Sequence, residues 1–362
     1  MKRFFLIVFF VPTLAFSAAY QNAALSASDL GSADAGSGSA IENASAQAFN
    51  PASLSRLKGM HLSLGWVGVS ENLKFNKQQN GGTWRNLPHI YWSAPLDDDL
   101  TLGLAYNHQA SWKNHYPASW QAQNWLIHSQ MQIENFNSNV AWRAHEKWRV
   151  GFGFSFARLK WQWKNASFAQ KNQKNAWGWQ AGILLTPSDS MNVSLSYQSP
   201  IWFKEQNWHF KTPPRFAIST WQQLNKQWEL MASVSWIKWK NNANLWIDEP
   251  SLLAQPIIST GSALRFAWGT AYAFSPSLKF KWGIAYDISP LKATERTPAL
   301  PHHNQWWLST GLRWKVQNKA YVDLAYSYVY ESRSDVHLPK LGLSGSYYNR
   351  AHWWGMQYSI HF

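Results

Sequence analysis

Apolar residues occupy every second position in one segment after another between Met60 and the C-terminus. The segment LTLGLAYN (100–107) places leucine and tyrosine on one side of an extended chain, with threonine, glycine, alanine and asparagine on the other. The pattern recurs in RVGFGFSFA (149–157), MNVSLSYQ (191–198) and YVDLAYSYVY (321–330). A period of two predicts β-strands. Outward aromatic rows with small or polar inner rows indicate a barrel in lipid, since a soluble sandwich carries charges on its outer faces.

Short and long polar connections alternate between these segments. The short ones are PLDDD (95–99), AHEK (144–147), TPSDS (186–190), NKQ (225–227), SPS (275–277) and QNK (317–319). Longer ones lie near 71–83, 108–129, 162–176, 202–213, 240–262, 288–304 and 331–348. Bacterial barrels have short periplasmic turns, long extracellular loops and an even number of strands. We therefore predict an all-β fold, a transmembrane antiparallel β-barrel of about 14 strands over residues 57–362.

The N-terminus predicts export. Lys2 and Arg3 precede an apolar run from Phe4 to Phe16, and the small residues of the segment SAA (17–19) follow, so residues 1–19 have the form of a signal peptide. The final segment HWWGMQYSIHF alternates up to the terminal Phe362, which is typical of a closing strand recognised by the barrel-assembly machinery. Together these features predict the bacterial outer membrane.

Composition narrows the chemistry. The chain has 26 tryptophans, whose rings favour the boundary between lipid and water, and no cysteine, which excludes disulfides and thiolate metal sites. The net charge of +14 comes from scattered residues without a dense Lys/Arg run, so we expect no nucleic-acid partner; lipopolysaccharide head groups and carboxylate ligands are the expected anions. We expect no cofactor and no metal, because the adjacent His302 and His303, with Asp287 nearby, lack further ligand spacing.

Residues 20–56 are rich in Ala, Ser, Gly and Asn, and composition alone would make them a linker. The stretch GSADAGSGSAIENASAQAFNPASLSRLKG (31–59), however, resembles the N-terminal hatch of the FadL/TodX family of outer-membrane transporters of hydrophobic compounds. The family's Asn-Pro-Ala motif before the first strand is matched by Asn50, Pro51 and Ala52. The segments 133–157 and 282–314 carry further resemblance, and the strand count agrees over the whole chain.

The resemblance implies a monomeric barrel plugged by the hatch, with passive transport of long-chain fatty acids or similar hydrophobic compounds. Extracellular loops capture the ligand, which passes to a pocket beside the hatch and leaves sideways through a gap made by an inward kink in the third strand. In larger family members the third and fourth extracellular loops are long. Here the fourth, near 202–213, is short, which puts an external capture groove in doubt.

A fatty acid needs apolar lining for its tail and a cation for its carboxylate. In the third loop the candidates for the tail are Trp112, Tyr116, Trp120, Trp125 and Leu126, with Lys113 at the mouth; packing of the loop itself is the alternative. Strand parity places a set of charges on the lumen face, where they bind a ligand or balance one another: Arg143, Arg265, Lys279, Lys281, Asp287, Arg313, Lys315 and Asp323.

Arg158 and the hatch complete the candidate site. Arg158 lies where the family has basic residues on the fifth strand, yet its parity matches outward phenylalanines, so either a bulge turns it inward or it meets lipopolysaccharide phosphate. The motif Asn50-Pro51-Ala52 is expected to form a turn into the wall. Gly36 and Gly38 allow the plug backbone to pack tightly or simply to flex.

Other functions suit the same architecture. An aromatic-hydrocarbon transporter has the same fold, and strand pattern does not separate it from a fatty-acid transporter. A general porin lacks a Gly-rich plug, and a lipid enzyme needs a nucleophile motif such as G-x-S-x-G, which the sequence lacks, so we expect no enzyme. A surface adhesin or phage receptor needs no hatch.

Overall fold

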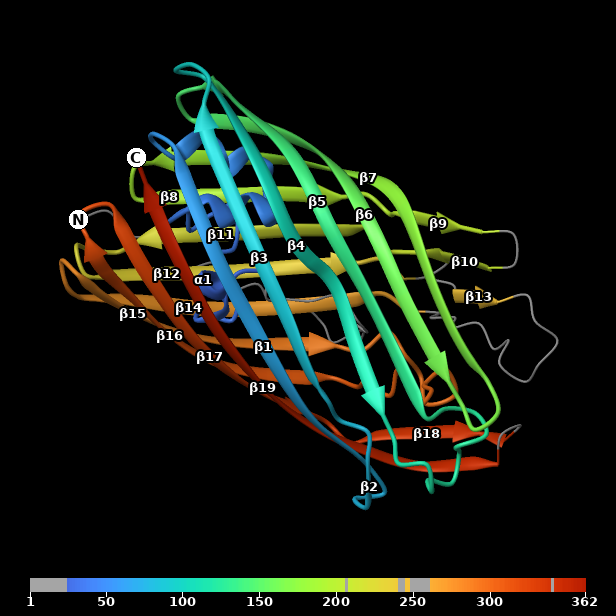
Figure 1. The fold of residues 1–362 in the computed structure, drawn as a ribbon. Helices are drawn as coiled ribbons and strands as arrows, with labels where there is room; N and C mark the ends of the chain where they lie inside the picture. Colours follow the sequence, from blue (N-terminus) through green and yellow to red (C-terminus); the bar gives the residue numbers. More distant parts are fainter. Residues whose placement is uncertain (1–24, 206–207, 240–244, 248–260, 340–341) are drawn as a thin grey trace.

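The computed structural model describes residues 25–205, 208–239, 245–247, 261–339 and 342–362, and the predicted signal peptide lies outside them. Fourteen antiparallel strands form a closed barrel, because β1 pairs with β19 from His61↔His361 to Phe75↔Tyr347 (Figure 1). Its strands are β1 His61–Phe75, β3 Trp84–Pro95, β4 Leu100–His115, β5 His128–His145, β6 Trp148–Lys164, β7 Ala169–Ser188, β8 Met191–Gln198, β11 Arg215–Gln223, β12 Trp228–Ile237, β14 Ala263–Ser275, β15 Leu278–Ile288, β16 Gln305–Gln317, β17 Ala320–Glu331 and β19 Leu343–His361. The predicted strand number is confirmed.

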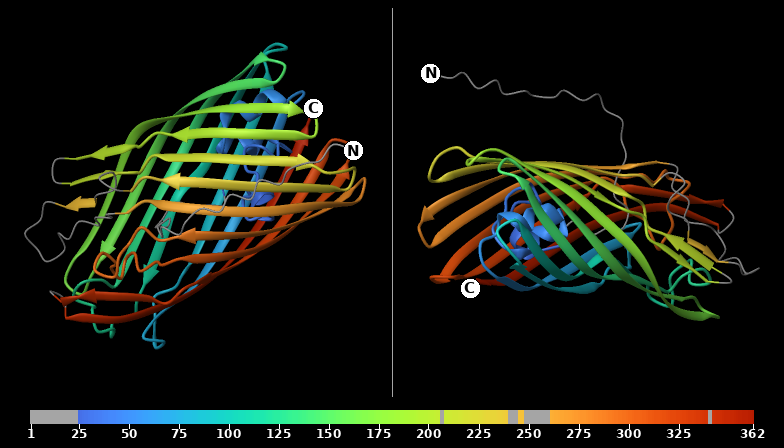
Figure 2. Two further views of the ribbon diagram at one scale, coloured as in Figure 1. Left: turned by 180° about the vertical axis from the view of Figure 1, so that it is seen from behind. Right: turned by 90° about the horizontal axis from the view of Figure 1, so that it is seen from above.

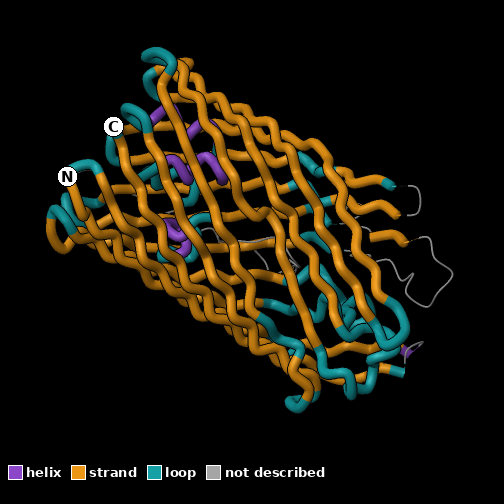
Figure 3. Tube along the Cα trace, viewed as in Figure 1, coloured by secondary structure: helices purple, strands orange, loops and turns teal. Residues whose placement is uncertain are grey.

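Short strands lie outside this ring. Strands β2 Gln79–Asn80 and β18 Ser334–Leu338 extend the ends of β1 and β19, and β9 Trp202–Lys204, β10 Trp208–Lys211 and β13 Leu245–Ile247 form a separate small sheet. The N-terminal hatch contains three short helical turns, α1 Ala27–Leu30, η1 Ala44–Ala48 and η2 Pro51–Arg56. The hatch lies inside the barrel, towards the end that carries the short turns and the C-terminus (Figure 2, Figure 3).

The two faces of the wall differ as the alternation predicts. Along β6, Phe152 and Phe154 are exposed on the outside, while the intervening Gly151, Gly153 and Ser155 are buried inside. Small inner side chains leave room for the hatch, and outward rings would be costly in water. No helix among the described residues is long and apolar enough to cross a membrane.

All six predicted short turns connect strands in the structure, and several of the long loops are shorter than predicted. β4 continues to His115 and β5 starts at His128, so the loop predicted near 108–129 spans 116–127 and is the second long loop along the chain, not the third. The third long loop is the β6–β7 connection, which has only residues 165–168. The fourth loop includes β9 and β10. Where strands extend past the membrane, they need no apolar outer face. These polar strand ends therefore show no alternation of hydropathy, and the sequence pattern does not predict them as strand.

Candidate functional site

Asn50 fixes the hatch to the barrel wall. Its Oδ1 accepts a hydrogen bond from the Ala52 backbone N–H (2.8 Å) at the start of η2, and its Nδ2 donates to Ser194 Oγ (2.7 Å) and Ile183 O (3.0 Å) on β8 and β7. Pro51 occupies the first turn of η2, where a missing N–H leaves no hydrogen bond unmade. The motif begins a helical turn and binds it to the wall through one buried amide.

Gly36 and Gly38 lie where the hatch backbone approaches β12 and η2. Both have positive φ angles, +74° and +84°, which disfavour any residue with a side chain. A Cβ on Gly36 would lie 2.9 Å from the side chain of Met231, and the Gly36 N–H donates to Ser233 Oγ (2.8 Å). These glycines therefore provide a specific conformation and close packing.

Glu42 is the centre of a charged anchor between the hatch and two neighbouring strands, β15 and β16. Its carboxylate contacts Lys279 Nζ (3.0 Å) on β15 and Arg313 Nη1 (2.9 Å) on β16, and it also pairs with Lys281 Nζ. Lys281 donates in addition to Ser28 O (3.1 Å) in the hatch. One hatch carboxylate thus draws together three cations of the wall.

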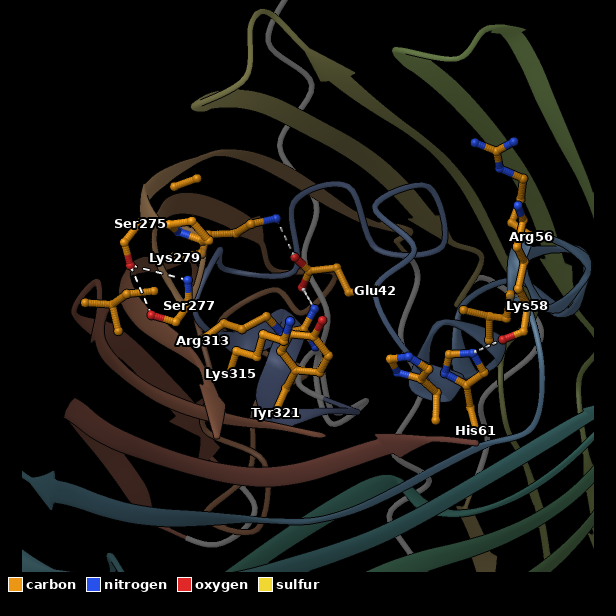
Figure 4. Close-up of a pocket in the computed structure, with 15 residues that line it drawn as sticks. Glu42, Arg56, Lys58, His61, Ser275, Ser277, Lys279, Arg313, Lys315 and Tyr321 are labelled. Carbon is orange, nitrogen blue, oxygen red and sulfur yellow. Dashed lines mark hydrogen bonds and ion pairs between the residues drawn. The ribbon is translucent and has the colours of Figure 1, made fainter. Parts of the chain in front are cut away.

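A hollow of about 540 Å³ adjoins this anchor at the short-turn end of the barrel. Figure 4 shows Glu42, Lys279 and Arg313 on one side and Arg56, Lys58 and His61, which lead from the hatch into β1, on the other. The anchor is therefore accessible from the side that the short turns mark as periplasmic.

Arg265 forms a second anchor, on β14. Its guanidinium makes two 2.8 Å hydrogen bonds to the carboxylate of Asp287 on β15. The other terminal nitrogen donates to Ala33 O (2.9 Å) and lies 3.4 Å from Asp34 Oδ2, both in the hatch. This arginine is 6% exposed, and its two terminal nitrogens are both bound to these groups.

The structure shows which groups the interior cations contact. Arg265, Lys281 and Arg313 are paired with hatch or wall acids, which leaves none of them available for a ligand carboxylate in this conformation. Charge balance, the alternative considered above, is what the geometry shows for them. Arg143 pairs with Asp99 at the exposed rim of the barrel (2.9 Å). Lys315 lines the hollow beside Glu42.

Arg158 lies on the outer face of β6, which is the second of the two orientations that the sequence left open. The β5–β6 ladder is regular around Glu134↔Arg158, so no bulge turns this side chain inward. It continues the row of Phe152 and Phe154, and its Nε donates to Asn175 Oδ1 (3.4 Å).

The aromatic residues predicted to hold a ligand tail pack together at the long-loop end. Tyr116 stacks on Trp120 with ring centroids 4.2 Å apart, and its hydroxyl donates to Pro298 O (2.8 Å) in the loop after β15. The cluster that they join is buried and includes Phe75, Trp112, Trp125, Leu126, Trp163 and Tyr347. Lys113 lies outside this cluster, half-buried on β4. The cluster forms a closed apolar cap between loop 116–127 and the strand ends.

The barrel wall is interrupted between β3 and β4. Their ladder runs only from Pro95↔Thr101 to Ile90↔Tyr106, although each strand continues and stays paired with its other neighbour. Pro88 of β3 has no N–H to donate, and β4 bulges at Gln109, where its register with β5 shifts. The bulge lies in the third barrel strand, the strand in which the resemblance implies a kink.

Side chains bridge the interruption in place of a ladder. His108 Nδ1 lies 3.1 Å from Pro88 O, Arg85 donates to Ser111 O, and Thr83 Oγ1 donates to Lys113 O (2.7 Å) where the strands come together again. The two amide atoms of Gln109 are buried, and neither has a partner among the described residues. This part of the wall is held by side-chain hydrogen bonds in place of a continuous ladder.

A polar chain connects the interruption to the hatch. His89, beside Pro88, has its Nε2 3.1 Å from Gln357 Oε1, and Gln357 Nε2 donates to Asn43 Oδ1 (3.1 Å). Asn43 also caps η1 through a bond from the Ser45 N–H (2.8 Å). A displacement of η1 therefore breaks bonds that end next to the gap.

An apolar hollow of about 540 Å³ opens on the outer surface next to the point where the β3–β4 ladder ends. Ile90 and Tyr106, the last paired residues of β3 and β4, line it together with Phe136, Phe156 and Trp177. An apolar molecule that passes the gap would meet aromatic rings instead of the polar rim.

Comparison with known proteins decides the family. Residues 8–207 and 203–362 match the model of a family described as outer membrane protein transport protein (OMPP1/FadL/TodX). The chain belongs to this family. It is therefore a transport protein of the bacterial outer membrane, as predicted.

Individual relatives of this OMPP1/FadL/TodX chain are distant but match almost end to end. It is 23% identical to the long-chain fatty acid transport protein of Salmonella typhi over 88% of this chain and 89% of that protein. It is 22% identical to outer membrane protein P1 of Haemophilus influenzae over 86% of each. A Pseudomonas aeruginosa FadL homologue superimposes with a TM-score of 0.84 at 16% identity, covering 96% of this chain and all of that one.

Sequence reasoning missed three residues of this site, namely Glu42, His89 and Gln109. Glu42 had a signal, because it is the one glutamate between residues 20 and 56, opposite a lumen with an excess of predicted cations. His89 and Gln109 had none, because their importance comes from an interrupted ladder.

Proposed function

We propose that this chain takes up long-chain fatty acids by passive diffusion and releases them sideways into the membrane. The interrupted β3–β4 wall is the observation that carries the proposal. It gives an apolar molecule a route from the barrel interior to the outer apolar hollow, beside a lumen that the hatch fills. A general porin needs neither a side route nor a hatch.

Two lines support the choice of substrate. The relatives of S. typhi and Escherichia coli named long-chain fatty acid transport proteins align over 88% of this chain. The closed cap of Tyr116, Trp120 and their neighbours supplies apolar surface at the loop end, where a ligand would enter by displacing it.

Aromatic hydrocarbons are the second candidate substrate, on one specific observation. The interior cations Arg265, Lys281 and Arg313 are bound to carboxylates of the protein, so charge alone does not select a fatty acid. A structural neighbour titled a Pseudomonas putida toluene transporter superimposes with a TM-score of 0.74. Comparing uptake of labelled oleate and labelled toluene separates the two substrates.

The route is tested in fatty-acid-transport-deficient cells with two variants of one residue. Deletion of Gln109 removes the extra residue of the bulge, so β4 can regain regular register with β5 and close on β3. Gln109→Ala keeps the residue count and therefore the bulge. We expect oleate uptake to fall strongly in the deletion and to persist in Gln109→Ala, with both barrels shown to be folded by their heat-dependent migration on gels.

Equal uptake by the two variants would overturn the lateral route. A chain lacking residues 20–48 provides the test of the plug, because oleate accumulation should change sharply once the hatch is gone. A folded wild-type barrel that accumulates no oleate would overturn the fatty-acid assignment, and toluene would be tested next.

The remaining expectations complete the proposal. The chain acts as a monomer after removal of residues 1–19, with residues 20–56 as the hatch. The barrel-assembly machinery recognises the closing strand that ends at Phe362, whose N–H donates to Met60 O (2.9 Å) next to the first strand. Outer-membrane lipids and lipopolysaccharide surround the wall.

A further inference from the structure

A third hollow, of about 500 Å³, lies on the outer surface at the long-loop ends of β1, β17 and β19. Four cations from separate segments line it: Lys74 on β1, Lys77 in the turn after β1, Arg333 after β17, and Arg350 on β19. Strands β1, β17 and β19 run side by side to this end, where β2 and β18 begin (Figure 1). The site is on the outer wall, separate from the hatch and the gap.

The charge of this hollow is largely uncompensated. Lys74 and Arg350 are exposed and have no acidic partner among the described residues, and Lys77 lies 5.2 Å over the ring of Tyr348. Arg333 pairs with Asp335 (2.9 Å), but this pair is well exposed and therefore weak. Three to four positive charges therefore lie close together here, and among the described residues no row of buried acids and no hatch carboxylate balances them.

The one carboxylate that borders the hollow is already bound. Glu331 is 3% exposed and accepts hydrogen bonds from the His303 N–H (2.8 Å), Gln305 Nε2 (3.0 Å) and Asn349 Nδ2 (3.0 Å). His302 Nδ1 lies a further 3.0 Å from it. These neighbours on the inner side of the wall hold its charge away from the outer surface.

The height of the hollow on the barrel identifies its surroundings. Trp354 of β19 stacks on Trp84 with ring centroids 5.5 Å apart, which marks the upper aromatic girdle. From Trp354 to Ile360 the outward residues of β19 are apolar over roughly 20 Å of strand. Arg350 is four residues beyond Trp354, so roughly 13 Å of strand places it above the apolar band.

Cations just above the lipid-facing rings meet the head groups of the outer leaflet. Arginine and lysine bind phosphate through charge-assisted hydrogen bonds, and basic pockets at this level are typical of lipid head-group sites. We propose that Lys74, Lys77, Arg333 and Arg350 form a binding site for a phosphate of the lipid A moiety of lipopolysaccharide. Tyr330 and Tyr348 border the hollow and face the sugar to which that phosphate is attached.

This inference is independent of the transported compound. It also differs from a general attraction of a cationic chain to an anionic leaflet, because it needs one hollow and not the net charge of +14. The outer face of β6 and β7 provides the comparison, since Arg158, Lys164 and Lys171 lie on it without acidic partners among the described residues.

The test uses the purified full-length barrel in detergent and counts bound Kdo2-lipid A by native mass spectrometry. Lys74→Gln/Lys77→Gln/Arg350→Gln removes three charges from the hollow, and Arg158→Gln/Lys164→Gln/Lys171→Gln removes three from the comparison face. We expect about tenfold weaker binding for the first triple variant and near wild-type binding for the second.

Two further arms separate the sources of phosphate. Lipid A without its phosphates should bind the wild-type barrel no more tightly than phosphorylated lipid A binds the first triple variant. Millimolar inorganic phosphate should leave lipid A bound, because a free ion lacks the acyl chains that place lipid A against the wall.

Equal loss in both triple variants would overturn the site in favour of nonspecific attraction. Undiminished binding of dephosphorylated lipid A would overturn phosphate as the recognised group, and displacement by inorganic phosphate would reduce the hollow to a simple anion site. Both variants must show the heat-dependent gel migration of a folded barrel; a triple variant that fails this control is replaced by Arg350→Gln alone, for which weaker binding is still required.

Discussion

Glu42 offers the sharpest test of how the hatch is held. Glu42→Gln keeps the shape of the side chain but removes the charge shared by Lys279, Lys281 and Arg313. Lys279 would retain Glu229 (2.6 Å) and Arg313 would retain Asp323 (2.9 Å). Lys281 would keep only Ser28, so a buried ammonium group would lose its one carboxylate.

The size of the effect follows from that loss. Removing one partner of a buried ion pair costs about 3–5 kcal/mol. Because Glu42 is 14% exposed and two of its three cations keep another acid, we expect the lower end, about 3 kcal/mol, for hatch docking. Since every 1.4 kcal/mol is about tenfold, the undocked population should rise by roughly 100-fold.

Hydrogen exchange measures this population directly. Amides of the hatch that are bound in the docked state, such as Gly36 and Ala52, should exchange roughly 100-fold faster in Glu42→Gln, while strand amides keep their protection. Glu205→Gln is the matched control, because its exposed pair with Lys174 (2.7 Å) contributes at most about 1 kcal/mol and lies far from the hatch. Hatch protection equal to that of the control would refute the anchor.

Three other outcomes are expected. Asn50→Ala should weaken hatch docking by about 2–3 kcal/mol, since it removes the η2 cap and the bonds to Ser194 and Ile183. Exchange of the hatch amides measures this, with Ser55→Ala as the control, because among the described residues the hydroxyl of this half-buried residue of η2 bonds only within its own turn. Gly38→Ala should cost about 1–3 kcal/mol, because φ is +84° there; a thermal midpoint equal to that of wild type would contradict the argument. Burial alone would lower the pKa of His302, but the Glu331 carboxylate raises this pKa above the ordinary 6.5. We therefore expect the loop 289–304 to resist proteolysis most strongly below pH 6.5 and to be cleaved faster as the pH rises through the raised pKa. An identical pH profile in His302→Gln would show that this histidine is not the cause.

Arg158 shows both the strength and the limit of parity. The alternation of β6 placed it with the outward phenylalanines, and the regular β5–β6 register agrees with that parity. The family resemblance suggested a lumenal role, and the structure does not support it. Where the two signals disagreed, local strand geometry was the better guide, because a strand without a bulge cannot turn one residue to the other face.

The interior cations show what parity leaves open. Alternation placed Arg265, Lys281 and Arg313 on the inner face, but it does not predict which acid each of them contacts there. Their partners are Asp287, Asp323 and, above all, Glu42, which comes from a segment with no periodic pattern at all. A hatch of small residues has no hydropathy signal from which its docked position could be read.

The sequence by itself determined the barrel, its strand number, its short turns and which side of each strand faces lipid. It could do so because a membrane imposes one local rule, apolar outside and small or polar inside, on every strand. Only the tertiary structure decided where Glu42 docks, where the β3–β4 ladder ends, and which cations gather above Trp354. These features depend on register and on contacts between residues far apart in the chain. A pattern of period two predicts which face of a strand a residue lies on, but it does not predict which residue it contacts.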